Sequence, residues 1–121
     1  MMAYEQAHIR PVVYAFGDLL FKAGDIASAV FLIRAGQVLL ESTKGPHIPS
    51  VTLASGDLCG ECAWDHPPIH KVTATVIQET EAWLFSLEEL YALLKAGQPA
   101  ITRAVLDAKA RQAAWRRMVM S

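Results

Sequence analysis

Short apolar runs separated by glycine turns dominate the first part of the chain. The runs are rich in Val, Leu, Ile and Phe, and a turn signal such as Gly-Asp follows about every ten residues. Regular short strands joined by glycine turns are typical of an all-β sandwich or barrel. We therefore expect strands over residues 12–15, 19–22, 30–34, 38–42, 51–53, 72–77 and 82–86. Gly36 is expected to form one of the turns, and the polar residues 78–81 another.

A helical pattern replaces the strands after residue 86. Ser86 and Glu89 form a capping box ahead of an apolar stretch. Gly97 is expected to end that helix and Pro99 to begin the next. We interpret the charged residues of the last helix as a solvated face: Arg103, Asp107, Lys109, Arg111, Arg116 and Arg117.

The last helix also carries a stripe of side chains at alternating spacings of four and three. Its members are Ile101, Val105, Ala108, Gln112, Trp115 and Val119. Such a stripe either packs on the barrel of its own chain or forms a parallel helix pair in a homodimer. The sequence leaves both interpretations open.

Composition narrows the function classes. The chain has 121 residues and a net charge of -1, so it has no overall attraction to nucleic acid or anionic lipid. It shows no signal peptide pattern and no apolar stretch long enough to span a membrane, and two cysteines three apart do not form a disulfide framework. No catalytic motif is visible. We expect a cytoplasmic protein of one domain, residues 1–121, that is not an enzyme.

The stretch Leu-Cys-Gly-Glu-Cys-Ala-Trp, residues 58–64, stands between two strand blocks. Backbone N–H groups at the start of a helical turn bind anions. Glu61 beside them is suited to accept a hydrogen bond from a hydroxyl group. The combination favours a sugar-phosphate ligand.

The glycine order along the chain resembles that of the cyclic-nucleotide-binding domains of bacterial catabolite activators, kinase regulatory subunits and gated channels. The resemblance rests on Phe-Gly-Asp-Leu-Leu-Phe-Lys-Ala-Gly-Asp (16–25), Val-Phe-Leu-Ile-Arg-Ala-Gly-Gln-Val (30–38), Gly-Asp-Leu-Cys-Gly-Glu-Cys-Ala (56–63) and Ala-Trp-Leu-Phe-Ser-Leu-Glu-Glu-Leu (82–90). It covers about residues 12 to 110. It implies a mainly β fold, a double-stranded β-helix or jelly-roll-like barrel over about 12–86, with flanking helices over about 87–119.

Residues 56–63 resemble the entrance to the phosphate-binding segment of that family, which we call the cassette. In that family, backbone amides of the cassette and an arginine hold the cyclic phosphate, and a glutamate holds the ribose hydroxyl. The resemblance therefore implies a site for cyclic AMP or cyclic GMP, with no other cofactor, made of Gly60, Glu61, Cys62, Ala63, His70, Lys71 and Val72. The arginine position falls on His70, and Lys71 replaces the small hydroxyl residue beside it. Losing one charge-assisted hydrogen bond weakens binding about ten- to a hundredfold.

Two alternatives to this site remain. The cassette could be a degenerate scaffold that binds no nucleotide, with Glu61 capping the helical turn. Cys59, Cys62, His66 and His70 are zinc-binding residue types, but their spacing is tighter than that of a zinc finger, so we expect no metal and assign both cysteines to the core.

The resemblance implies a regulatory module that transmits ligand occupancy to a partner protein or to a homodimer through the last helix. Activators of this family carry a DNA-binding helix-turn-helix after that helix. The given sequence ends at Ser121, so we expect no DNA contact by this chain alone, whether it acts alone or within a larger protein.

Overall fold

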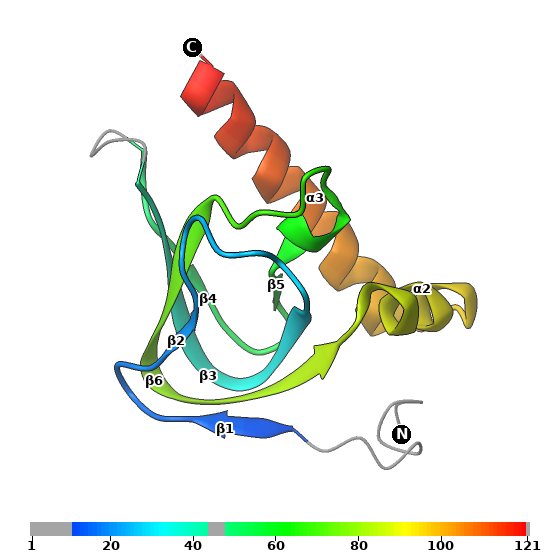
Figure 1. Cartoon of the computed structure of the whole chain (residues 1–121). Helices are drawn as coiled ribbons and strands as arrows, with labels where there is room; N and C mark the ends of the chain where they lie inside the picture. The colour runs from blue at the N-terminus through cyan, green and yellow to red at the C-terminus, as the bar shows by residue number, and fades with distance from the viewer. Residues whose placement is uncertain (1–10, 44–47, 121) are drawn as a thin grey trace.

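Two long antiparallel strands form the frame of the molecule. The computed structural model describes residues 11–43 and 48–120, with side chains up to residue 118. Strands β3 (Val30–Ser42) and β6 (Val72–Phe85) pair from Val30↔Phe85 to Ser42↔Val72. Short strands extend the sheet on both sides: β1 (Val12–Tyr14) and β2 (Leu19–Phe21) pair with β6, and β4 (Val51–Leu53) and β5 (Leu58–Cys59) pair with β3. The sheet curls into the jelly-roll-like barrel that the sequence predicted (Figure 1).

The two long strands correct the expected turns at Gly36 and over residues 78–81. Strand β3 continues through Gly36, where the register against β6 shifts and the backbone has φ +102°. A Cβ atom there would lie 2.3 Å from the carbonyl oxygen of Glu79. Glycine therefore forms a bulge, which bends a strand without ending it. Opposite it, β6 continues through the buried Thr80, whose hydroxyl donates to the carbonyl oxygen of Gln78 at 2.7 Å.

Apolar side chains form two clusters, one on each side of the curved sheet. The inner cluster fills the barrel with side chains that include Phe31, Ile33 and Cys59. The outer cluster lies between the barrel and the helices, and it includes Val30 and Leu32. Successive residues of β3 thus point alternately into the two clusters, which explains why residues 30–33 are all apolar and all buried.

The predicted helix boundaries are confirmed. Helix α2 (Leu87–Lys95) begins with the expected capping box: Glu89 N donates to Ser86 Oγ at 3.1 Å, and Ser86 N donates to Glu89 Oε1 at 2.8 Å. Gly97 follows its end with φ +74°, and helix α3 (Pro99–Met120) begins at the expected proline.

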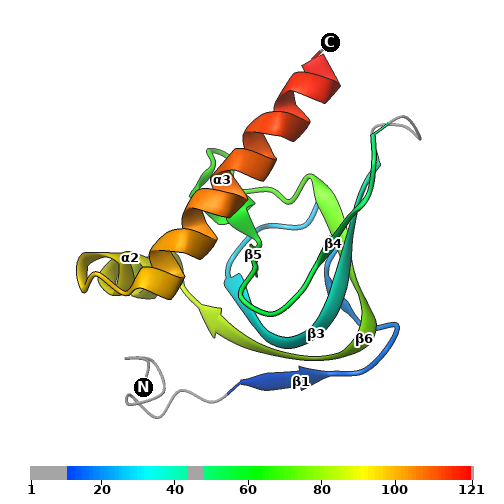
Figure 2. The same cartoon turned by 180° about the vertical axis from the view of Figure 1, so that it is seen from behind.

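Helix α3 packs its apolar stripe on its own barrel. Ile101, Val105 and Ala108 are buried in the outer cluster, so the homodimer interpretation of these three residues is wrong. The side chain of Val119 lies outside the described residues. Helix α3 lies against β5 and the following 3-10 turn (Figure 2). None of the helices in the described part of the chain is long and apolar enough to cross a membrane.

Candidate functional site

Gly60 turns the chain from β5 into the 3-10 turn η1 (Glu61–Trp64). Its backbone has φ +89°, and a Cβ atom would lie 2.8 Å from the carbonyl oxygen of Ala29. Any other residue would combine a left-handed conformation with a backbone clash. The glycine therefore lets the cassette pass close to β3 and places Glu61 on the inner side of the turn.

Glu61 forms a buried ion pair with Arg111 of helix α3. Arg111 Nη2 lies 3.2 Å from Glu61 Oε1, and the two side chains are 12% and 6% exposed. The same nitrogen donates to the carbonyl oxygen of Leu58 at 2.6 Å. Burial raises the pKa of Glu61, while Arg111 and the backbone N–H groups of Glu61 and Gly60 act in the opposite direction. A carboxylate that is buried this far needs a cation, and α3 supplies it.

The sequence interpretation missed Arg111, which it placed on a solvated face. The helical spacing contained the signal, because Arg111 follows the buried Ala108 by three residues and precedes Gln112 of the stripe by one. Arg103 and Asp107, by contrast, pair on the exposed side of the helix at 3.5 Å, as expected.

Asp65, directly after η1, joins the cassette to helix α3 through a second polar cluster. Its carboxylate accepts hydrogen bonds from Gln112 Nε2 at 2.9 Å and from Arg116 Nη2 at 3.1 Å. Trp64 Nε1 donates to Gln112 Oε1 at 3.3 Å, and Lys71 Nζ lies 3.9 Å from Asp65 Oδ2. Two carboxylates of the cassette region, Glu61 and Asp65, therefore hold α3 at adjacent turns.

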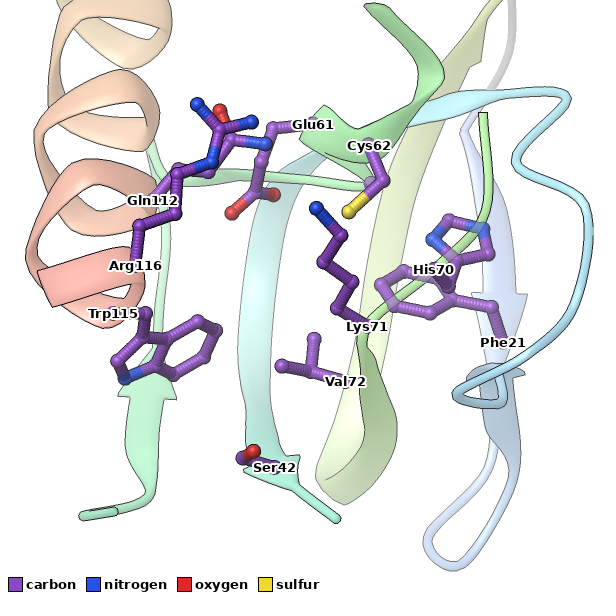
Figure 3. A pocket seen from close by; sticks show the side chains of 11 residues that line it. Phe21, Ser42, Glu61, Cys62, His70, Lys71, Val72, Gln112, Trp115 and Arg116 are labelled. Carbon is purple, nitrogen blue, oxygen red and sulfur yellow. The ribbon is translucent and has the colours of Figure 1, made fainter. Parts of the chain in front are cut away.

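A pocket of about 310 Å³ lies between the cassette, the start of β6 and helix α3 (Figure 3). Six of the seven predicted site residues line it: Gly60, Glu61, Cys62, His70, Lys71 and Val72. Helix α3 contributes Gln112, Trp115 and Arg116. Ala63 does not line the pocket, because the 3-10 turn directs it against the outer cluster under the helices. Trp115 packs against the inner cluster from the helix side and covers the pocket.

His70 occupies the position where the resemblance implies an arginine. It is 4% exposed and stacks on Phe21, with ring centroids 3.7 Å apart and planes 9° from parallel. Burial lowers its pKa below the ordinary value of 6.5, and Asp25 acts in the opposite direction. The imidazole is therefore neutral at pH 7, and its Nδ1 atom is buried with no hydrogen-bond partner in the described part of the chain.

Lys71 and Val72 continue the same edge of the pocket. The Lys71 side chain is 59% exposed and stands at the pocket mouth near Asp65, whereas Val72 is buried in the inner cluster. Lys71 is thus a cation that water reaches, and it lacks the planar fork with which an arginine binds a phosphate.

Cys59 and Cys62 are buried free thiols, and burial raises the pKa of both. Cys59 lies in the inner cluster, as its assignment to the core predicted. Within residues 11–43 and 48–120, no group of His, Cys, Asp and Glu side chains is placed to hold a metal ion.

Comparison with known families matches residues 11–96 to the family described as the cyclic nucleotide-binding domain. Among solved structures, the chain is similar to the catabolite activator protein of Thermus thermophilus, with a TM-score of 0.70 and 21% identity over 94% of this chain and 54% of that one. It is also similar to the N-terminal domain of a transcriptional regulator from Streptomyces coelicolor A3(2), with a TM-score of 0.61 and 26% identity over 98% and 86% of the two chains.

A third similar structure is an enzyme, the cAMP-binding acyltransferase from Mycobacterium smegmatis, mutant R95K. Its TM-score is 0.65 and its identity 23%, over 88% of this chain and 33% of that one. The chain therefore spans about half the length of the activator and a third of the acyltransferase. A search of curated protein sequences found no match.

Proposed function

Because this chain belongs to the cyclic nucleotide-binding domain family, we propose that it is a regulatory module that senses a small molecule in the pocket beneath α3. The observation that carries the proposal is that the helix itself closes the pocket. Trp115, Gln112 and Arg116 line it from α3, while Arg111 fastens the same helix to Glu61. A molecule in the pocket touches both the cassette and the helix.

Occupancy changes the position of α3 through the polar contacts of the cassette. Gln112 and Arg116 both bind Asp65, and both also face the pocket. A ligand that competes for either side chain weakens the attachment of α3, and one that bridges them strengthens it. In either case the ligand binds the two helix positions with different affinity, which is the thermodynamic requirement for a switch. The signal is read by a partner protein or by a second copy of the chain.

A homodimer through α3 needs a face of the helix other than the predicted stripe. Leu106 is 60% exposed on that helix and lies outside both apolar clusters. We propose the face around Leu106 as the contact in a homodimer.

A cyclic nucleotide is the ligand that the family suggests. The positions of Gly60 and Glu61 at the pocket support it, whereas the neutral His70 at the arginine position opposes it. Thermal unfolding with millimolar cyclic AMP or cyclic GMP tests this ligand directly. A ligand that binds only the native state adds about 2.7 kcal/mol of stability at a hundred times its dissociation constant. We expect a rise in melting temperature that is lost in Trp115→Glu, where a charge enters the pocket.

The second candidate is a protein-interaction scaffold without a ligand. The Glu61–Arg111 pair favours it, because the carboxylate that would hold a ribose hydroxyl is already satisfied within the chain. The two functions give different results in ligand screening. A scaffold shows no saturable stabilisation by any small molecule, and a sensor shows it with at least one.

A further inference from the structure

Most of the wall surface of the pocket beneath α3 is aromatic or aliphatic. Trp115 covers it from the helix, and the stacked pair of Phe21 and His70 stands on the opposite side (Figure 3). Val72 and Cys62, both buried, line the space between them. Surfaces of this kind bind flat rings, because aromatic faces stack on one another and on apolar side chains.

Each described cation near the pocket already has a carboxylate partner. Arg111 is paired with Glu61 at 3.2 Å and is not among the residues that line the pocket. Arg116 and Lys71 share Asp65, at 3.1 Å and 3.9 Å, and their side chains are 52% and 59% exposed. A phosphate placed among the apolar walls would lose its hydration without gaining a free buried cation, which disfavours binding of an anion.

His70, which lines the pocket, carries a buried polar atom that lacks a partner among the described residues. His70 Nδ1 is shielded from water and has no hydrogen-bond partner in the described part of the chain. In neutral imidazole, each ring nitrogen is either a donor or an acceptor. A hydroxyl group can donate or accept, so a ligand that carries one satisfies this atom in both tautomers, and an N–H group satisfies it where Nδ1 is the acceptor.

The size of the pocket limits the ligand further. At about 310 Å³ it lies at the small end of ligand pockets, which run from roughly 300 to 1,000 Å³. The space suits a molecule of one fused ring system with a small substituent.

From these walls, charges and dimensions we propose that the pocket binds an uncharged, planar aromatic molecule carrying a hydroxyl or N–H group, in preference to a phosphate ester. The molecule lies between Trp115 and the Phe21–His70 stack and hydrogen-bonds to the imidazole. This ligand class rests on the proposed sensing function, since it concerns the same pocket.

Two matched pairs of probes test the ligand class: adenosine against cyclic AMP, and 2-naphthol against 2-naphthyl phosphate. Each pair shares a ring system and differs in the phosphate group. Titration calorimetry on the full chain measures all four affinities. We expect the uncharged member to bind at least about tenfold more tightly in any pair that binds. A smaller ratio in such a pair, or tighter binding of the phosphate ester, overturns the inference and leaves the sensing function standing. Binding of none of the four also overturns the inference, and the ligand screen described above then decides the sensing function.

Two variants locate the effect in the pocket. Trp115→Ala should weaken the uncharged probe about tenfold, because it removes one stacking face. Tyr91→Ala, which removes an exposed aromatic side chain from α2, is the matched control and should bind like wild type. Equal binding of the uncharged probe by Trp115→Ala and wild type contradicts the placement.

His70→Arg introduces a cation at the arginine position of the family and should shift the preference of the pocket toward the phosphate ester. Circular dichroism shows whether His70→Arg folds. If it does not fold, Trp115→Ala alone tests the placement.

Discussion

The buried ion pair between Arg111 and Glu61 gives the sharpest test of how α3 is held. In Arg111→Met the aliphatic part of the side chain is kept and the charge is removed. Glu61, which is 5% exposed, then loses the cation with which it pairs among the described residues, and the carbonyl oxygen of Leu58 loses the hydrogen bond from Arg111. Breaking one side of a buried pair costs about 3–5 kcal/mol, which is a large share of the stability of a small domain.

The matched control lies on the same helix. Arg103 pairs with Asp107 four residues later at 3.5 Å, with side chains 80% and 54% exposed. Such exposed pairs contribute at most about 0.5 kcal/mol. Urea unfolding at pH 7.5 should therefore show that Arg111→Met loses several times more unfolding free energy, relative to wild type, than Arg103→Met does.

The pH dependence identifies the cause. Burial already raises the pKa of Glu61 above its ordinary value of 4.5, and removing Arg111 raises it further. An acid with a raised pKa binds protons more tightly in the folded state, so stability falls as pH rises from about 4.5 through the folded pKa. The cost of Arg111→Met should thus be smaller at pH 5 than at pH 8.

Adding Glu61→Gln to Arg111→Met should restore most of the unfolding free energy that Arg111→Met loses at pH 8, because the double variant no longer buries an unpaired charge. Two results would refute the reasoning: a cost of Arg111→Met no greater than that of Arg103→Met, or a cost that is the same at pH 5 and pH 8.

Three further predictions concern His70, the sheet and the exposed face of α3. Because the pKa of His70 is lowered in the folded state, its contribution to stability is complete above about pH 6.5 and is lost as the pH falls through the folded pKa. His70→Phe should therefore lose less unfolding free energy than wild type between pH 6.5 and pH 5. The same pH dependence in both proteins would contradict this prediction. Gly36→Ala should cost at least ~2 kcal/mol more than Gly24→Ala in urea unfolding, because both have positive φ but only the first has backbone within 4 Å of the added Cβ. Light scattering should give twice the chain mass for wild type and one chain mass for Leu106→Glu; a monomeric wild type rules out this dimer.

The family and the architecture could be predicted from the sequence because they depend on local signals. Gly17, Gly24 and Gly56 have positive φ and lie in turns, as the sequence predicted. Ser86 and Glu89, three residues apart, form the capping box that starts helix α2. The cassette was recognisable for the same reason, since Gly60 and Glu61 are neighbours in the chain. Six of the seven residues expected at the site line one pocket.

The tertiary structure decided which local conformation Gly36 adopts and which surface the stripe on α3 packs against. Gly36 resembles the turn glycines in sequence, yet it forms a bulge because β6 passes close beside it and continues the pairing. The stripe on α3 fitted a dimer and a barrel equally well by spacing, and burial of Ile101, Val105 and Ala108 in the outer cluster selects the barrel.

The chemistry of the pocket likewise depends on long-range contacts. Glu61 and Arg111 are fifty residues apart, and only the docking of α3 brings their charges to 3.2 Å. His70 becomes a neutral, stacked ring because Phe21, from a distant strand, covers it. A sequence gives residue types and their spacing, whereas burial and pairing set their charge, and these are properties of the folded chain.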